Sequence, residues 1–155
     1  MKFAHTGDCH IGGWGRQPEL FELSLMSFSL FVDTCVKEKL DFVLIAGDFF
    51  DSAYPAIEAL QEAFKDFRRL KEANIPVFII AGSHDYSASG KSFLEVLEKS
   101  GFVKNVFNSE ERNDAIYLYP TIYKNVAIYG YPGKRSGLEV DEINRIKLHD
   151  APGLF

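Results

Sequence analysis

Polar side chains able to bind a metal ion or to move a proton follow the ends of three short segments of this sequence. These side chains are Asp8, His10, Asp48, Asp51, Ser83 and His84. Carboxylate and imidazole ligands together suit manganese, iron or zinc. A carboxylate can also bridge two metal ions about 3.5–4 Å apart, an arrangement suited to hydrolysis of a phosphate ester. The pattern therefore indicates metal-assisted chemistry on a phosphate ester.

The segments that precede these side chains, at 2–6, 41–46 and 76–81, are expected to form parallel strands. The second is short, apolar and rich in β-branched residues, as buried parallel strands are. Each segment is followed by a glycine, which allows the backbone to turn. Sites in open α/β sheets lie just beyond the carboxyl ends of the strands. We therefore expect the polar side chains to converge at one edge of a parallel sheet.

Each of these motifs, taken alone, also has an ordinary structural interpretation. Asp8 and Asp48 could each cap a helix, and residues 82–85 could form a simple turn. The occurrence of three such motifs, each after a strand, favours the functional interpretation. His84 is then a candidate proton donor, because neighbouring negative charge would hold its pKa high.

The rest of the chain predicts a layered α/β fold with right-handed crossovers. Helical periodicity is expected at 19–39, 56–73 and 92–100, and a fourth strand at 102–107. A charged turn follows at 108–113. The remaining expected elements are strands at 115–119 and 125–131, joined through a turn near Tyr123, and a helix at 137–149.

The composition is that of a globular chain long enough for one domain. Of 155 residues, 46% are hydrophobic, and no apolar run approaches the roughly 20 residues of a membrane span. The N-terminus leads directly into a functional turn, so a cytoplasmic protein without a signal peptide is expected. The net charge of −5 argues against a strongly basic nucleic-acid surface. It is compatible with a phosphate substrate, because bound divalent cations would reverse the local field.

The motifs resemble those of a known enzyme family. Asp-x-His, Gly-Asp-x-x-Asp and Gly-Ser-His-Asp stand in the order found in calcineurin-like metallophosphoesterases, which usually have Asn where Ser83 stands. Met-Lys-Phe-Ala-His-x-x-Asp-x-His-x-Gly and Leu-Ile-Ala-Gly-Asp-x-Phe are most similar to the SbcD-like DNA exonucleases, which include the nuclease subunit of the double-strand-break repair complex. The resemblance is good over residues 1–107, and the later residues fit by the order of elements only.

The resemblance implies a metallophosphoesterase-type sandwich of sheets flanked by helices, with residues 1–155 as the N-terminal part of a single nuclease domain. It implies a phosphodiesterase acting on DNA with two divalent ions, most simply manganese. Asp8 and His10 would ligate the first ion, Asp48 would bridge both, and Ser83 would be a weak ligand of the second.

The resemblance also implies roles for the remaining candidates and for partners. His84 would stabilise the transition state or protonate the leaving oxygen, and Asp51 would orient His84. The implied partners are DNA and a coiled-coil ATPase, with a homodimer left open. The family's later histidine motifs are missing, and His149, interpreted as a cation at a helix end, is a poor substitute. Residues 1–155 alone are therefore expected to be inactive.

Several alternatives stay open at this point. The same chemistry could serve small nucleotides or phosphoproteins, or the chain could be a DNA-end-binding scaffold with a degenerate site. Trp14 and Tyr86 could stack on a base or simply pack on their own helices. Cys9 and Cys35 are expected to be reduced thiols, with Cys9 a less favoured metal ligand.

Overall fold

The computed structural model describes residues 1–87, 90–134 and 139–154, which belong to two compact units. Unit 1 is Met1–Asn105 and unit 2 is Val106–Phe155. The expectation that all 155 residues are part of one domain stays a prediction.

Within the described part of unit 1, parallel strands form a sheet in the order β1-β2-β3-β4. The strands are β1 (Phe3–Thr6), β2 (Phe42–Ala46), β3 (Val77–Ile80) and β4 (Lys104–Asn105). Phe3 lies beside Phe42, and Val43 lies beside Val77. Because these strands are parallel, the carboxyl ends of β1, β2 and β3 meet at one edge of the sheet, as predicted.

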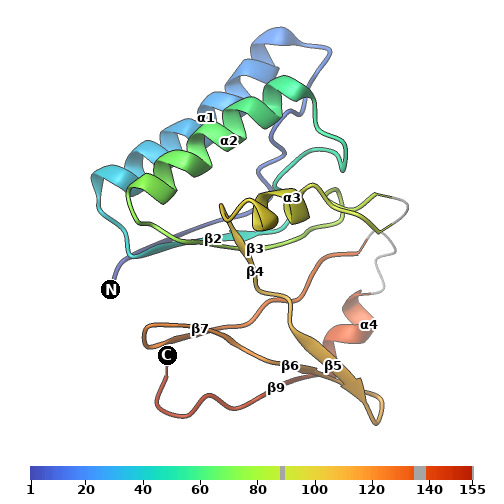
Figure 1. Cartoon of the computed structure of the whole chain (residues 1–155). Helices are drawn as coiled ribbons and strands as arrows, with labels where there is room; N and C mark the ends of the chain where they lie inside the picture. Colours follow the sequence, from blue (N-terminus) through green and yellow to red (C-terminus); the bar gives the residue numbers. More distant parts are fainter. Residues whose placement is uncertain (88–89, 135–138, 155) are drawn as a thin grey trace. The chain divides into compact units, whose positions relative to one another are not determined.

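Helices connect these strands. They are α1 (Pro18–Lys37), α2 (Ile57–Glu72) and α3 (Leu94–Lys99). α1 and α2 pack against each other and lie on the same face of the sheet (Figure 1). α1 buries Phe28, Val32 and Cys35, which are spaced as one face of a helix requires. The predicted layered α/β fold is confirmed.

The core between the helices and the sheet anchors the turn after β2, which carries Asp48. Phe49, the residue after Asp48, has no exposed surface. Its ring lies 5.0 Å from that of Phe28 on α1 and 5.1 Å from that of Phe67 on α2, measured between centroids. Burying one such side chain contributes about 1.5–3 kcal/mol. The turn after β2 is therefore anchored in the core.

Unit 2 contains a sheet in the order β5-β6-β9 and a separate hairpin of β7 with β8. The elements are β5 (Ser109–Arg112), β6 (Ala115–Leu118), β7 (Thr121–Tyr123), β8 (Val126–Ile128), α4 (Glu139–Ile143) and β9 (Ile146–Leu148). The strands expected at 115–119 and 125–131 are present in shorter form. They belong to different sheets, since β8 pairs with β7 rather than with β6.

The charged turn expected at 108–113 is wrong, because residues 109–112 form strand β5 and pair with β6. Asn113 and Asp114 have φ angles of +50° and +59° and connect the two strands. Positive φ at both central residues is typical of a tight hairpin turn. All four residues of β5 are exposed, so the strand carries no apolar alternation that sequence could reveal.

The helix expected at 137–149 is wrong in its second half. Positions 137 and 138 lie outside the described residues, and α4 ends at Ile143. Ile146 and Lys147 pair in parallel with Ile116 and Tyr117 of β6. His149 therefore follows a strand rather than ending a helix, and its ring lies 4.9 Å from that of Tyr119.

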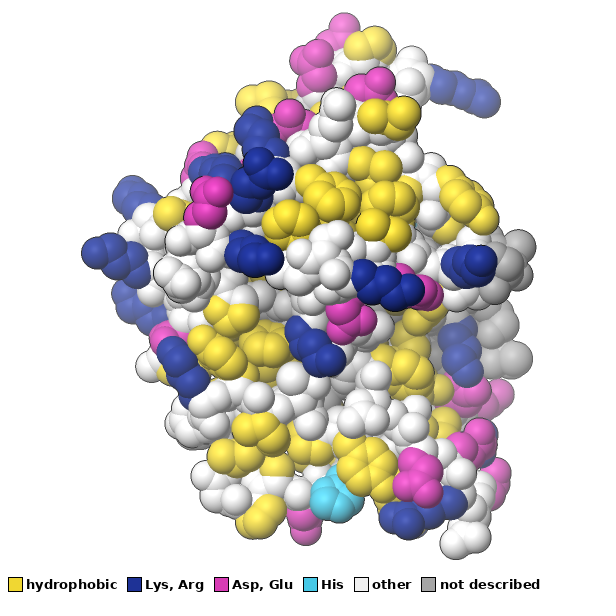
Figure 2. All heavy atoms as spheres, viewed as in Figure 1, with side chains coloured by type: hydrophobic (Ala, Val, Ile, Leu, Met, Phe, Trp, Pro, Cys, Tyr) yellow, Lys and Arg dark blue, Asp and Glu magenta, His cyan; other side chains and the backbone are white. Residues whose placement is uncertain are grey.

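Hydrophobic side chains also remain on the surface of unit 1. Figure 2 shows them grouped where α2 and α3 lie, bordered by Lys and Arg. Exposed large side chains of unit 1 include Ile57 on α2, Val96 on α3 and Tyr54 in the segment before α2. Among the described residues, no helix combines the length and the apolar character needed to traverse a lipid bilayer.

Candidate metal centre

The loops after β1 and β2 run side by side beyond the ends of these strands. The backbone N–H of Asp8 donates to the carbonyl of Gly47 at 3.0 Å, and that of His10 donates to the carbonyl of Asp48 at 3.0 Å. The hydrogen bonding of the parallel strands thus continues into the loops. It places Asp8 and His10 beside Asp48.

These three side chains form a cluster with the geometry of a metal site. The ligand atoms that Asp8, His10 and Asp48 offer all lie within 4.8 Å of one another. The φ angles of the three residues are +56°, +46° and +46°, in the left-handed region that side chains other than glycine rarely adopt. Each such residue costs on the order of 1–3 kcal/mol, and residues of this kind gather at functional sites.

The loop after β3 completes the surroundings of Asp48. One carboxylate oxygen of Asp48 accepts a hydrogen bond from the backbone N–H of His84 at 2.7 Å. The other accepts one from the Ser83 hydroxyl at 3.4 Å. The structure therefore brings Ser83 and His84 to the same edge of the sheet as Asp48, and the two hydrogen bonds fix the orientation of the carboxylate.

Asp85 is a residue of this site that sequence reasoning missed. It is 2% exposed, and its carboxylate accepts hydrogen bonds from the backbone N–H groups of Gly82, Phe50 and Phe49 at 2.9, 3.1 and 3.3 Å. Burial raises the pKa of Asp85, and the three N–H donors oppose that rise. Asp85 thus joins the loops after β2 and β3. The contact with Gly82 is local, but nothing in the sequence links Asp85 to Phe49 or Phe50.

The two histidines share one neighbour. His10 Nδ1 lies 2.9 Å from Asp51 Oδ1, while its Nε2 lies 3.0 Å from Asp8 Oδ1. His84 Nδ1 lies 2.9 Å from the backbone carbonyl oxygen of Asp51. The expected contact between Asp51 and His84 is therefore made by the backbone, and the Asp51 carboxylate contacts His10 instead. Burial alone would lower the pKa of His10, but hydrogen bonds to Asp8 and Asp51 outweigh it and raise that pKa.

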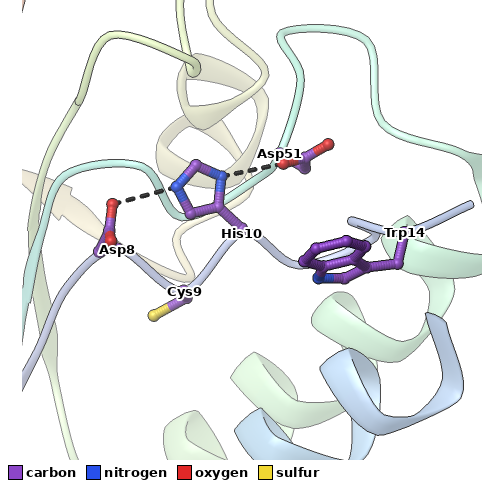
Figure 3. Close-up of a pocket in the computed structure, with 5 residues that line it drawn as sticks. All are labelled: Asp8, Cys9, His10, Trp14 and Asp51. Carbon is purple, nitrogen blue, oxygen red and sulfur yellow. Dashed lines mark hydrogen bonds and ion pairs between the residues drawn. The ribbon is translucent and has the colours of Figure 1, made fainter. Parts of the chain in front are cut away.

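A pocket of about 560 Å³ is lined by Asp8 and His10 of the cluster and by Asp51. Figure 3 shows His10 between Asp8 and Asp51, with Trp14 at another part of the wall. The Trp14 side chain is 65% exposed. The remaining lining residue, Cys9, is a weaker candidate ligand, because burial raises the pKa of its thiol and its sulfur points away from His10 in Figure 3. Tyr86, the other aromatic residue considered, is partly buried against the core.

The donor set fits a divalent cation. Two carboxylates and one imidazole are a combination of ligands that suits manganese, iron or zinc. Asp8 is 82% exposed in its side chain and His10 is 30% exposed, so an ion can reach the cluster from solvent. Ser83 adds only a hydroxyl near Asp48. In unit 1, Asp8, His10 and Asp48 form one group of three possible ligands. His10 also belongs to a second such group, with Asp51 and His84.

The chain is similar to proteins of a known family. The family described as calcineurin-like phosphoesterase matches residues 1–153. The chain is 31% identical to the DNA double-strand break repair protein Mre11 of Archaeoglobus fulgidus over 84% of its length and 32% of the relative's. Identity to the protein of the same name from Saccharolobus solfataricus is 33%, over 85% of this chain and 33% of the relative. Identity to the protein of the same name from Methanococcus maripaludis is 35%, over 71% of this chain and 33% of the relative. The chain spans about a third of the length of these curated relatives.

The close approach of two loops predicts that Gly82 tolerates no side chain. A Cβ atom at Gly82 would lie 2.3 Å from the backbone nitrogen and from Oδ1 of Asp48. We expect Gly82→Ala to lower the free energy of unfolding by about 1–3 kcal/mol, as overpacking does, and to weaken Mn²⁺ binding. Urea denaturation and a Mn²⁺ titration measure the two effects.

Gly15→Ala is the matched control, because a Cβ atom at Gly15 would meet nothing within 4 Å. Its effect on unfolding should stay within about 0.5 kcal/mol. Equal stability and equal Mn²⁺ affinity in the two variants would show that the loops do not need their close contact.

Proposed function

Because the chain belongs to the calcineurin-like phosphoesterase family, we propose that it is part of a metal-dependent nuclease that hydrolyses DNA phosphodiester bonds in double-strand-break repair. The observation that carries this proposal is the convergence of Asp8, His10 and Asp48 on one point at the sheet edge. The names of relatives that are 31–35% identical support the choice of DNA as substrate.

Each ligand has a proposed role. Asp8 and His10 would hold the first divalent ion, Asp48 would contact both ions, and Ser83 would contribute to the second. We propose manganese for both ions, since the donor set suits it. When bound, the ions would lower the pKa of a water molecule and offset the charge of the phosphodiester. Asp48 is prepared for its role, because its carboxylate is already oriented by Ser83 and His84.

His84 is the proposed general acid. Its Nδ1 faces the carbonyl oxygen of Asp51, which can only accept a hydrogen bond, so Nδ1 carries a hydrogen. The Nε2 atom is therefore the one left to meet a substrate. In the imidazolium form, Nε2 would give its proton to the leaving oxygen as the phosphorus–oxygen bond breaks.

Trp14 supports a nucleic acid rather than a phosphoprotein as the substrate. Its indole ring is largely exposed and lies in the wall of the same pocket as Asp8 and His10. Stacking of one base on an aromatic side chain contributes about 1–3 kcal/mol. We propose that Trp14 stacks on an unpaired base next to the phosphodiester that is cleaved.

The partners and the dependence on further sequence also belong to this proposal. We infer a coiled-coil ATPase partner from the resemblance to the family, and we also propose a cytoplasmic location. We also propose a homodimer, in which a second copy of the chain would cover exposed apolar side chains of unit 1. Residues 1–155 alone should not cleave DNA, because Asp8, His10, Asp48 and Ser83 offer too few ligands for two ions.

The decisive experiment compares DNA cleavage in Mn²⁺ by residues 1–155 and by a protein extended to the length of the relatives. We expect cleavage only by the extended protein. In it, His84→Ala should lower turnover by roughly 10²–10⁴-fold, the usual share of a general acid. Mn²⁺ content should hardly change, because the backbone N–H that orients Asp48 is kept. Loss of the bound metal in His84→Ala would contradict the role of His84, and cleavage by 1–155 alone would contradict the need for further ligands.

Trp14→Ala tests whether Trp14 contributes to binding of DNA but not of small substrates. In the extended protein, this change should raise KM for single-stranded DNA by roughly 5–160-fold, the equivalent of one lost base stack. The rate of hydrolysis of a small phosphodiester with no base to stack, bis(p-nitrophenyl) phosphate, should stay the same. Trp14→Phe keeps an aromatic face and should retain most of the affinity for DNA. A loss of both activities in Trp14→Ala would favour a structural role for Trp14, and no loss of either would remove the support that Trp14 gives to DNA.

A further inference from the structure

Asp51 contacts both histidines of the site through different atoms. Its carboxylate oxygen Oδ1 lies 2.9 Å from Nδ1 of His10, and its backbone carbonyl oxygen lies 2.9 Å from Nδ1 of His84. The two imidazole rings are nearly perpendicular, with centroids 4.8 Å apart. Asp51 thus contacts Nδ1 of both histidines, through its side chain in His10 and through its backbone in His84.

These contacts orient the two rings. The Asp51 carbonyl only accepts hydrogen bonds, so Nδ1 of His84 carries a hydrogen. In His10 both ring nitrogens face a carboxylate, that of Asp51 at Nδ1 and that of Asp8 at Nε2. A cation held by Asp8 would take the place of a hydrogen on Nε2 and leave the hydrogen on Nδ1 with Asp51. The Nε2 atom of His10 is then directed at Asp8, 3.0 Å away, where a cation would be bound. A ligating histidine usually gives its other ring hydrogen to a carboxylate or a carbonyl, which orients the ring and makes the ligating nitrogen more basic.

We propose that Asp51 is a positioning residue whose side chain fixes His10 as an Nε2 ligand of the metal ion, while its main chain holds His84 independently. This inference rests on the proposed metal-binding role of His10. It differs from the role that the family resemblance implies, in which Asp51 serves His84.

The backbone of Asp51 is held without help from its side chain. Its N–H donates to the carbonyl of Ile11 at 3.2 Å, and Ile11 forms a parallel bridge with Phe50. Ile11 and Phe50 are 2% and 1% exposed, whereas the Asp51 side chain is 46% exposed. A substitution at position 51 should therefore remove the contact with His10, keep the contact with His84 and leave the fold intact.

Two substitutions separate orientation from charge. Asp51→Ala and Asp51→Asn both remove one negative charge near the cation. Asp51→Asn keeps an oxygen that can accept from His10 Nδ1, and its amide nitrogen can face solvent. If Asp51 acts by orienting His10, the two variants will differ in Mn²⁺ affinity. If it acts only by adding negative charge, they will be alike.

The test is a Mn²⁺ titration of the full chain, followed by electron paramagnetic resonance, in wild type, Asp51→Asn and Asp51→Ala. We expect Asp51→Ala to bind Mn²⁺ roughly 10–100-fold more weakly than wild type, the usual effect of removing such a partner of a metal ligand. Asp51→Asn should bind Mn²⁺ nearly as tightly as wild type. Equal weakening in both variants, or no weakening in Asp51→Ala, overturns the proposal.

Nitrogen-15 spectra of the histidine rings give a second readout that does not depend on metal affinity. In the metal-free chain at a pH where the histidines are neutral, Asp51→Ala should shift His10 toward the tautomer with its hydrogen on Nε2, because Asp8 is then the remaining acceptor, and should leave His84 with its hydrogen on Nδ1. A change in His84, or none in His10, contradicts the proposal. Cleavage enters neither measurement, so a protein that binds Mn²⁺ but cleaves no DNA would overturn the proposed function and leave this inference standing.

Discussion

The site depends on the continuation of β-sheet hydrogen bonding beyond the ends of β1 and β2. The bonds from the Asp8 and His10 N–H groups to the carbonyls of Gly47 and Asp48 hold two loops in register. Side chains on short loops would otherwise be mobile, and a cation needs its ligands within a narrow range of distances. The backbone pairing supplies that constraint before any ion binds, so the loss of entropy on binding is small.

The same constraint explains the unusual backbone of the loops. Asp8, His10 and Asp48 all have positive φ, which the surrounding structure must offset. Phe49 contributes through its burial between α1 and α2, and Asp85 contributes by accepting three backbone N–H groups from two loops. The buried side chains of Phe49 and Asp85 thus help to hold the three ligand residues in their strained backbone conformation. The packing of the core therefore contributes to the geometry of the site.

Much of unit 1 could be predicted from the sequence, because its signals are local. Apolar segments that end in a glycine placed Asp8, Asp48 and His84 after strands, and a parallel sheet brings such residues to one edge. The contact between the Asp51 carboxylate and His10 could not be predicted, since it joins residues 41 positions apart through a loop register. In unit 2, strand β5 could not be predicted, because it is a run of exposed polar residues without apolar alternation. The hairpin turn that pairs it with β6 depends on positive φ angles at Asn113 and Asp114.

The central claim is that Asp8, His10 and Asp48 form one divalent-cation site as folded. The most direct measurement is the Mn²⁺ affinity of the chain beside that of Asp48→Asn, with circular dichroism to verify that both are folded. Asp48→Asn keeps the size of the side chain and removes its charge. We expect Mn²⁺ binding to the unchanged chain and a loss of at least about tenfold in affinity in the variant. Equal affinity in two folded proteins would show that the cation binds elsewhere and would contradict this account of the site.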